Sequence, residues 1–258
     1  MNQDEVKQYW EGRAQTHLPG QKTTLDVYLR EIEYRNLASW IALTKPKSVL
    51  DVGCGDGKTT IRLARELPDI QFVGVDYSTS MISSAINDAN ELINLKFEVG
   101  DILNPNGLGI YDLVYTNRCL INLTTWELQQ KAIFNLGNLV MPGGSLVLIE
   151  NLLESQNHFN GLRRKLRLDP IPIREHNLFF SKEALNSELN RYFRTVEIRN
   201  LSSTYYVITR VFYSFFCKIT KRNPNYTGSA HRFASRLRSF GDFGPINLIA
   251  ASNSISID

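Results

Sequence analysis

The sequence predicts an open α/β sheet of seven mostly parallel strands, with helices on both faces and a helical lid. Three observations predict this fold class. Short apolar runs typical of buried strands alternate with helical patterns between residues 46 and 151, and a glycine-rich turn follows the first of these strands directly. Two further strand patterns come after residue 190, separated by a long segment of helical character. Strands that alternate with helices pair in parallel and are covered on both faces.

The first 45 residues predict an N-terminal helical cap. Along residues 24–42, one helical stripe collects the apolar side chains Leu25, Tyr28, Leu29, Ile32, Trp40 and Ile41. Thr24 is the expected N-cap of this helix, and Pro46 ends it. We therefore assign residues 1–45 to a cap that precedes the sheet.

Residues 46–151 predict the ligand-binding core. Strands are expected at 48–52, 71–76, 95–101, 111–117 and 144–151. Helices are expected at 58–68, 78–92 and 124–140, and Thr124 and Glu127 form a capping box at the start of the last one. The carboxyl ends of parallel strands meet at one edge, which is where open α/β sheets bind their ligands.

Residues 152–258 complete the sheet and supply the lid. This half is expected to lie on the side where a second ligand, the acceptor, would bind. Residues 154–190 have a largely helical pattern, and strands are expected at 194–201 and 245–255. The segment between these strands, 201–243, predicts a basic, aromatic-rich lid. Its residues 201–241 hold seven Arg and Lys and no Asp or Glu, in a chain whose net charge is only +3. They form either a solvated face or a patch for an anionic partner, such as a phosphorylated substrate, a membrane surface or nucleic acid.

The longest apolar run, residues 205–219, has 15 residues and contains Arg210 and Lys218. A helix needs about 20 apolar residues to span a bilayer, so this run does not predict a transmembrane helix. At helical spacing it carries Ile208, Val211, Phe212, Phe215 and Ile219. We expect these side chains to pack in the core, and a membrane-surface or partner-binding helix is the alternative.

The composition is that of an ordinary globular chain. With 258 residues, 43% apolar and 21% charged, it predicts one large domain or one domain with an insertion. The three cysteines Cys54, Cys119 and Cys217 are odd in number and lack the spacing of a disulfide framework. The first 15 residues lack a basic region followed by an apolar stretch, so we expect no signal peptide and a cytoplasmic protein. We expect no metal site.

The turn "VLDVGCGDGKTT", residues 49–60, indicates the kind of ligand. The phosphate-binding loop of ATP and GTP proteins needs a glycine five positions before Gly57, and Val52 stands there. The dinucleotide-binding pattern G-x-G-x-x-G fails as well, because Lys58 occupies its sixth position. Asp51 would repel a pyrophosphate but suits a ligand with an ammonium or sulfonium group.

Acidic residues follow three successive strands of the predicted sheet. They are Asp51, Asp76 and Asp101, and Asp76 comes 21 positions after Gly55. A carboxylate at Asp76 can accept hydrogen bonds from both hydroxyls of a ribose. Asp101 and the backbone amide of Ile102 can contact the exocyclic amine and a ring nitrogen of adenine. The edge of the sheet therefore suits an adenosine that carries positive charge.

The motifs "LDVGCGDG", "VGVDYS", "VGDIL", "YDLVYTN" and "MPGGSLVLIEN" occur in this order within residues 45–151. Together they resemble the motifs of class I S-adenosylmethionine-dependent methyltransferases, which implies a Rossmann-like fold and S-adenosyl-L-methionine as the cofactor. The resemblance implies that Asp51 and Gly53 border the methionine part and that Asp76 binds the ribose. It further implies that Tyr77 flanks the adenine, which Asp101 and Ile102 contact. The full cofactor-binding set that we predict is Tyr9, Arg30, Asp51, Gly53, Gly55, Asp76, Tyr77, Asp101, Ile102, Asn117 and Arg118.

Methyl transfer to a hydroxyl would use a general base, and His176 in "IPIREHNLFF" is the candidate. Apolar neighbours lower the pKa of an imidazole and keep it neutral near pH 7. Glu150, at the end of a strand, orients His176, binds the acceptor or caps the following helix. The residues predicted to bind the acceptor are Asn151, Asn177 and Arg210. The end of the fourth strand, "TNRCLINL", differs from the Asn/Asp-Pro-Pro-Tyr/Phe pattern that the resemblance links to nitrogen methylation, which favours an oxygen acceptor.

The span from "NRCLINL" through "IEN" to "HNLFF", and the later "FGDFGP", resemble a subgroup of these methyltransferases associated with saccharides and surface-polysaccharide biosynthesis. Glu175 stands where that subgroup usually has Trp, which puts the identity of the acceptor in doubt. The basic lid favours an anionic or sugar-linked small molecule, such as a nucleotide sugar. Two alternatives remain at this point: a non-catalytic adenosylmethionine-binding protein, and an RNA methyltransferase that uses residues 201–241.

Overall fold

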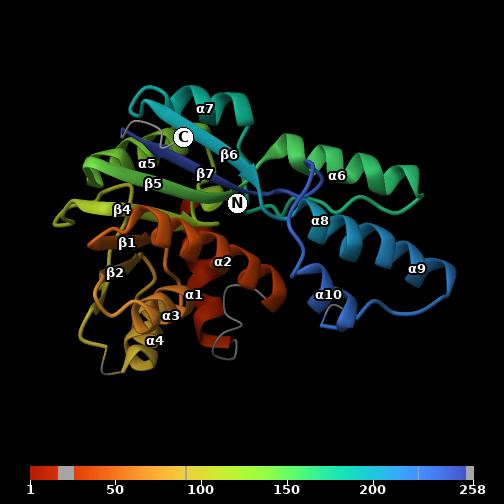
Figure 1. Ribbon diagram of the computed structural model, residues 1–258, viewed down its shortest axis with the longest axis horizontal. Helices are drawn as coiled ribbons and strands as arrows, with labels where there is room; N and C mark the ends of the chain where they lie inside the picture. Colours follow the sequence, from red (N-terminus) through yellow and green to blue (C-terminus); the bar gives the residue numbers. More distant parts are fainter. Residues whose placement is uncertain (17–25, 91, 226, 254–258) are drawn as a thin grey trace.

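The sheet of the computed structural model has seven strands in the order β3-β2-β1-β4-β5-β7-β6 (Figure 1). The structure describes residues 1–16, 26–90, 92–225 and 227–253. The strands are β1 (Ser48–Val52), β2 (Gln71–Asp76), β3 (Leu95–Val99), β4 (Tyr111–Asn117), β5 (Val140–Asn151), β6 (Thr195–Asn200) and β7 (Ile246–Ser252). Strands β1 to β5 pair in parallel, whereas β7 runs antiparallel to both β5 and β6. The predicted open, mostly parallel seven-stranded sheet is confirmed.

Helices cover both faces of the sheet, which is why its central strands are apolar almost without interruption. On one face, α5 (Trp126–Leu139) and α7 (Lys182–Leu189) pack on a core that includes Leu50 and Val114. On the other face, α2 (Val27–Thr44) and α3 (Lys58–Glu66) pack on a core that includes Val49 and Leu113. Alternate residues of β1 and β4 therefore supply two separate cores.

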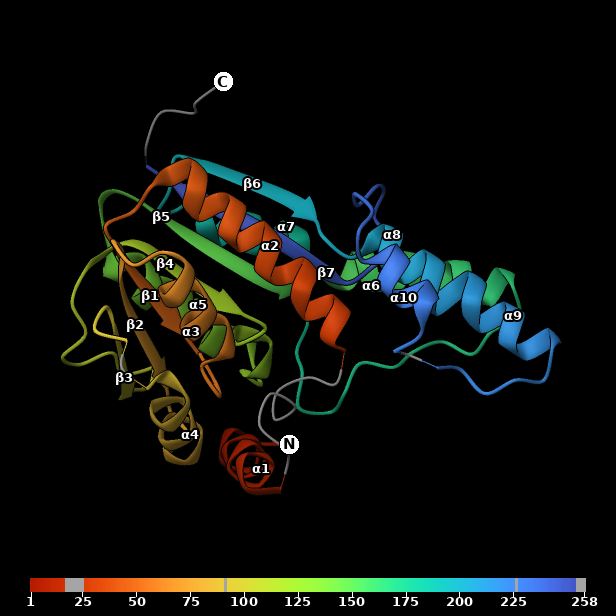
Figure 2. The same ribbon diagram turned by 60° about the horizontal axis from the view of Figure 1, so that its bottom comes forward.

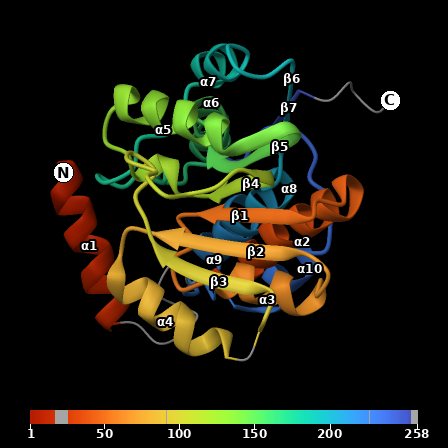
Figure 3. The same cartoon turned by 90° about the vertical axis from the view of Figure 1, so that its left-hand side faces the viewer.

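The N-terminal helix α1 (Gln3–Thr16) lies beside α4 (Thr79–Ala89), as Figures 2 and 3 show. The carboxylate of Glu11 accepts a hydrogen bond from the backbone N–H of Thr79 at 2.9 Å, at the first residue of α4. An acidic side chain at that position also suits the positive end of the helix dipole. This contact places α1 at the carboxyl edge of the sheet.

Two predicted helix starts differ from those in the structure. The N-cap of α2 is Asp26, whose carboxylate accepts from the N–H of Leu29 at 3.0 Å, and the predicted cap Thr24 lies outside the described residues. The capping box predicted for Thr124 and Glu127 is wrong. Thr125 has the extended backbone of an N-cap, and its hydroxyl accepts from the N–H of Leu128 at 3.3 Å.

The glycine-rich turn between β1 and α3 depends on its last glycine. Gly57 has φ 69°, a left-handed conformation that favours glycine. A Cβ at this position would lie 2.5 Å from Cζ of Phe97 and 2.8 Å from Cβ of Ala85. Glycine is therefore required by the backbone conformation and by the close packing of β3 and α4 alike.

A helical lobe projects from one end of the sheet (Figure 2). It consists of α6 (Leu153–Lys165), α8 (Ser203–Tyr206), the π-helical stretch η2 (Val207–Phe212), α9 (Tyr213–Ile219) and α10 (Ser229–Ala234). Its centre is a cluster of Phe159, Leu168 and Val211. The basic, aromatic segment thus lies between the last two strands along the chain, as the sequence predicts. Among the described residues, no helix has the length and apolar character needed to cross a membrane.

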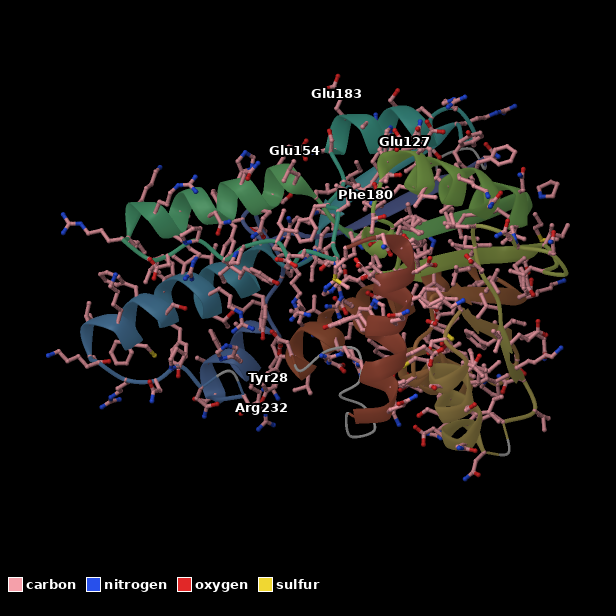
Figure 4. The ribbon with its side chains drawn as sticks, turned by 180° about the vertical axis from the view of Figure 1, so that it is seen from behind. Tyr28, Glu127, Glu154, Phe180, Glu183 and Arg232 are labelled. Atoms are coloured by element: carbon pink, nitrogen blue, oxygen red, sulfur yellow. The ribbon has the colours of Figure 1, made fainter. Side chains whose placement is uncertain are left out.

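The connection from α6 to α7 is anchored where it ends. The carboxylate of Glu154 accepts from the N–H of Lys182 at 3.0 Å, and the N–H of Leu153 donates to the carbonyl of Phe180 at 2.8 Å. Figure 4 shows Glu154 beside the start of α7, with Phe180 turned toward the sheet. These bonds fix the loop that carries His176.

Candidate functional site

The carboxyl edge of the sheet contains a cavity of about 520 Å³. Its walls come from α1, α2, the glycine-rich turn, the ends of β2 and β4, and residues 171–177. The predicted site residues that line it are Arg30, Asp51, Gly53, Gly55, Asp76, Tyr77, Ile102, Asn117, Arg118, Asn151, His176, Asn177 and Arg210. Tyr9, Asp101 and Glu150 are not among the lining residues. The volume is in the range of small-molecule sites, which runs from roughly 300 to 1,000 Å³.

The first two glycines of the turn bring the backbone close to the neighbouring strands. The N–H of Gly53 donates to the carbonyl of Val75 at 2.8 Å, and Gly53 has φ 75°. A Cβ at Gly53 would overlap the side chain of Cys119, which follows β4. The N–H of Gly55 donates to the carboxylate of Asp76 at 2.9 Å. The turn is therefore held against the ends of both β2 and β4.

Asp51 is a buried carboxyl that lines the cavity. Its Oδ2 accepts from the hydroxyl of Tyr115 at 2.7 Å and from the hydroxyl of Thr60. Burial raises the pKa of Asp51 to about 7, although these two hydrogen bonds favour the charged form. A cation bound beside this carboxyl would lower its pKa again, so Asp51 is suited to a positively charged ligand.

Asp76 ends β2 and uses both carboxylate oxygens. Oδ2 accepts from Gly55, and Oδ1 accepts from the N–H of Ser78 at 2.9 Å. Burial raises the pKa of Asp76 to about 6, against the opposing effect of these two bonds. Each oxygen keeps a second lone pair that can accept a hydrogen bond from a ligand hydroxyl.

The predicted adenine contacts lie at the ends of β2 and β3. Gly100 and Ile102 line the cavity, but the side chain of Asp101 between them does not. The Oδ1 of Asp101 accepts from the N–H of Leu103 at 2.9 Å. Tyr77 lines the cavity, and Nζ of Lys7 on α1 lies 5.5 Å from the centre of its ring. Helix α1 thus reaches this side of the site.

His176 lines the cavity from the loop between α6 and α7 and is 7% exposed. The ring of Tyr9 lies 4.5 Å from its ring, centre to centre, at an interplanar angle of 31°. Burial lowers the pKa of His176, and the positive charges of Arg174 and Arg13 lower it further. A lowered pKa keeps this imidazole neutral near pH 7. Tyr9 therefore reaches the site by packing on His176.

Asn122 is a site residue that the sequence interpretation missed. It lines the cavity, and its Oδ1 accepts from Trp10 Nε1 at 3.2 Å and from Asn177 Nδ2 at 3.1 Å. Its own Nδ2 donates to the carbonyl of Arg118 at 2.9 Å. One amide thus connects α1, the end of β4 and the His176 loop. Asn122 comes five residues after the end of β4, and a polar residue so close to the carboxyl end of a strand is a sequence signal for the site.

Glu150 does not have the predicted role beside His176. It is completely buried, and its carboxylate accepts from the hydroxyl of Thr116 at 2.9 Å and from the backbone N–H groups of Cys119, Leu120 and Ile121 at 3.0, 2.9 and 3.4 Å. Among the described residues, no hydrogen bond joins it to His176. Through these backbone hydrogen bonds, Glu150 holds the turn that follows β4. It does not cap the helix after β5 either.

Glu33 is a second residue missing from the predicted set. It lies on α2, lines the cavity and is 1% exposed. Nε of Arg118 lies 3.0 Å from its Oε1, and Nδ2 of Asn117 donates to its Oε2 at 3.4 Å. Burial raises the pKa of Glu33, whereas the charge of Arg118 opposes this. Its place one helical turn after Arg30 was a usable signal, since both belong to the same face of α2.

Arg210 lines the cavity from η2 and joins the lobe to the rest of the molecule. Its Nη2 donates to Oδ2 of Asp26 at 2.7 Å, and its Nη1 lies 3.2 Å from Nε2 of His231. The hydroxyl of Tyr205 donates to the same Asp26 at 2.7 Å. The N-cap of α2 is therefore also the point to which the lobe is attached.

Comparisons with known proteins find methyltransferases. Residues 43–169 match the family model described as "Methyltransferase domain". The chain is 34% identical over 119 residues to a trans-aconitate 2-methyltransferase of Deinococcus radiodurans, a match that covers 46% of this chain and 43% of that protein. It is 29% identical over 136 residues to a putative methyltransferase of Invertebrate iridescent virus 6, covering 52% of this chain and 48% of that protein. The chain spans about half the length of the curated relatives it matches.

Among solved structures, the N-methyltransferase NodS from Bradyrhizobium japonicum, determined with S-adenosyl-L-homocysteine, superimposes with a TM-score of 0.59. The match covers 95% of this chain and 96% of NodS at 15% sequence identity. At 15% identity, the superposition shows a shared fold and no more. The sheet and its helices therefore have the Rossmann-like methyltransferase fold.

Proposed function

Residues 43–169 match a methyltransferase-domain model, and from this premise we propose that the chain is a class I methyltransferase that transfers a methyl group from S-adenosyl-L-methionine to an oxygen of a small anionic acceptor. One observation carries the proposal. Asp51 and Asp76 line a single cavity together with Gly53 and Gly55, at the carboxyl ends of adjacent parallel strands. This arrangement supplies carboxyl groups beside the ligand and lets the backbone at the glycines approach it closely. It lacks the sequence pattern of a phosphate-binding loop.

The residues of this edge fit such a cofactor. S-adenosylmethionine, when bound, supplies an activated methyl group on a positively charged sulfur. Asp51 would contribute the charge beside its methionine part, because burial raises its pKa and a bound cation would stabilise its charged form. Asp76 would accept hydrogen bonds from the ribose hydroxyls. Gly53 would let the backbone approach the ligand, where a side chain would already overlap Cys119.

The acceptor would lie between His176 and the arginines of the cavity wall. His176 is neutral near pH 7, so it would accept the proton of an acceptor hydroxyl as the methyl group is transferred. Alignment of the two reactants is worth roughly 7 to 11 kcal/mol of barrier, and the hydrogen bonds that anchor the loop around the buried His176 support that alignment. Asn151 and Asn177 line the same region and would hydrogen-bond the acceptor.

The cavity wall favours an acceptor with negative charge. Arg13 and Arg174 line the cavity and lie near enough to His176 to lower its pKa, and Arg30 lines it from α2. Arg118 and Arg210 line it as well, paired with Glu33 and Asp26. A sugar phosphate or nucleotide sugar, as used in surface-polysaccharide biosynthesis, would present both an anion and hydroxyl groups. An organic acid is the second candidate, because the trans-aconitate 2-methyltransferase relative is named for an organic anion.

Calorimetric titration with S-adenosylmethionine, ATP and NAD tests the cofactor assignment. We expect binding of S-adenosylmethionine alone, and we expect Asp76→Ala to abolish it. Asp69→Ala changes an exposed carboxyl in the turn before β2 and is the matched control. Binding that survives in Asp76→Ala, or equal binding of NAD, would overturn the assignment.

The acceptor is tested by incubating the protein with methyl-labelled S-adenosylmethionine and a cell extract, followed by mass spectrometry of small molecules and RNA. We expect label on an oxygen of a phosphorylated sugar or nucleotide sugar. Label on an organic acid would support the second candidate. Label on RNA, or cofactor binding without any transfer, would contradict the proposed reaction.

A further inference from the structure

The outer face of α9 presents a continuous apolar stripe to solvent. Phe212, Phe216 and Ile219 are 58%, 46% and 62% exposed, and their spacing places them on one side of the helix. The sequence predicts that Phe212 and Ile219 pack in the core, and the structure contradicts this for both residues. Val211 fills the core of the lobe, and Phe215 packs against it. No described segment covers the stripe, so it is an apolar surface without a partner.

Exposed basic side chains lie at the same tip of the lobe as this stripe. The ammonium group of Lys218 donates to the carbonyl of Arg167, so α6 and α9 end side by side, as Figure 1 also shows. Cζ of Arg222 lies 6.0 Å from the ring centre of Phe216. The exposed cations at this tip are Arg164, Lys165, Arg167, Lys218, Lys221 and Arg222. Residues 155–174 and 201–241 together contain twelve Arg and Lys and a single acid, Asp169.

The same combination occurs on α10 and the residues that follow it. Phe233, Leu237 and Phe240 are exposed, and the exposed cations Arg232, Arg236 and Arg238 are their neighbours along the chain. Figure 4 shows Arg232 at the outer edge of α10, directed away from the sheet. Apolar and cationic side chains therefore alternate over two helices of the lobe.

We propose that the tip of the helical lobe docks on the surface of an anionic lipid bilayer. The stripe of α9 would enter the boundary between headgroups and acyl chains, while the surrounding lysines and arginines contact lipid phosphates. Each cation near such a surface contributes about 1 kcal/mol of attraction, and six exposed cations lie at the tip that carries the stripe. The helix would lie in the plane of the membrane, since it is too short to cross it.

The side chains favour lipid over nucleic acid. Ile219 and Leu237 are aliphatic, so they cannot stack on bases, whereas they can be buried among acyl chains. This docking goes beyond the proposed methyl transfer and does not depend on it. It also has a geometric consequence, because Tyr206 and Arg210 of the same helical run line the cavity. A docked lobe would hold the acceptor side of the cavity near the membrane surface.

Flotation of the full chain with vesicles tests the proposal. One vesicle type contains phosphatidylglycerol in phosphatidylcholine, and the other contains phosphatidylcholine alone. We expect binding to the anionic vesicles, weakened by salt, and at least tenfold weaker binding to neutral ones. The variants Phe212→Ser/Phe216→Ser/Ile219→Ser and Lys218→Glu/Lys221→Glu/Arg222→Glu should each lower the binding at least tenfold.

Matched controls change the same kinds of side chain elsewhere. Leu43→Ser/Ile110→Ser removes exposed apolar side chains, and Lys47→Glu/Lys131→Glu/Lys182→Glu reverses three exposed charges outside the lobe. Both should float as the wild type does, and circular dichroism confirms that every variant is folded. The proposal is overturned if the wild type ignores anionic vesicles or if the lobe variants bind them unchanged. It is also overturned if light scattering shows that the stripe holds a dimer, or if RNA binding, rather than vesicle binding, depends on the lobe cations.

Discussion

At the scale of single residues, burial acts in opposite directions on the acids and the histidine of the site. Burial raises the pKa of Asp51 and Asp76 to about 7 and about 6, because water no longer stabilises their charge. The same loss of water lowers the pKa of His176, whose charged form is the protonated one. The site therefore combines carboxyls whose pKa is raised with an imidazole whose pKa is lowered.

Binding of S-adenosylmethionine should release protons. The cationic ligand stabilises the charged form of Asp51, so its pKa falls on binding and the affinity rises as the pH increases from about 5 to about 8. At pH 6.5 we expect the release of roughly one proton per ligand, measured by calorimetry in buffers of different ionisation enthalpy. Asp51→Asn should remove most of the release, whereas Asp69→Asn should leave it unchanged. The same release in both variants would exclude Asp51 as its source.

His176→Ala should retain cofactor affinity and lose turnover by about 10² to 10⁴-fold, which is the usual contribution of a general base. Because the pKa of His176 is lowered, the wild type should stay active at pH 7 and lose kcat/KM only in more acidic solution, as the imidazole becomes protonated. Methyl transfer to the identified acceptor across pH 5 to 9 measures both effects. His158→Ala, at an exposed histidine of α6, is the control. Unchanged turnover in His176→Ala would leave this residue a structural role only.

Two buried polar side chains hold backbone segments of the same edge in place. Glu150 binds three consecutive backbone N–H groups after β4, and Asn122 connects α1 with the His176 loop. Glu150 holds the turn after β4 in position, and Asn122 holds α1 and the His176 loop together. The pKa of Glu150 is raised to about 7 by burial, and four hydrogen bonds oppose that effect without cancelling it.

At the scale of elements, the glycine-rich turn determines where the cavity can form. Gly53 and Gly55 hold the turn against the ends of β2 and β4, and Gly57 starts α3 where a side chain would meet Phe97. A helix that starts so close to a strand end leaves its first N–H groups at the cavity. The turn is therefore both a packing contact and one wall of the site.

Gly57→Ala should lower the free energy of unfolding by about 2 to 4 kcal/mol. About 1 to 2 kcal/mol comes from the left-handed backbone, and the remainder comes from the overlap with Phe97 and Ala85. Gly107→Ala is the matched control, because Gly107 has φ 83° and a Cβ there would have no atom within 4 Å, so only the backbone cost applies. Urea unfolding of both variants gives the difference. Equal losses would show that the packing around Gly57 can relax.

At the scale of the whole molecule, a charged contact joins the helical lobe to the start of α2. Asp26 caps α2 and binds Arg210 and Tyr205 of the lobe, so one carboxylate serves the helix and the attachment together. The cavity has walls on both sides of this contact. Its shape therefore depends on how the lobe is held.

Asp26→Ala should cost about 3 to 5 kcal/mol of stability, because Arg210 would lose the partner of a largely buried ion pair. Thr125→Ala removes an N-cap without an ion pair and should cost only about 0.5 to 2 kcal/mol. Urea unfolding at pH 7 compares the two, and limited proteolysis shows whether the lobe loosens in Asp26→Ala. A loss no larger than that of Thr125→Ala would mean that the cap alone explains the role of Asp26.

The sequence by itself determined the order of the strands along the chain, the glycine-rich turn, and the acids Asp51 and Asp76 at adjacent strand ends. These features can be predicted because they depend on local patterns: apolar runs, glycine spacing and the residue that follows each strand. Parallel pairing then places the carboxyl ends together without further information.

Only the tertiary structure decided which side chains meet across elements. It paired Glu33 with Arg118, placed Tyr9 on His176 and turned Glu150 under the end of β4. It also left Phe212 and Ile219 exposed, although their spacing resembles that of core residues. The physical reason is that helical spacing shows which residues share a face, whereas the packing of neighbouring elements decides whether that face is covered.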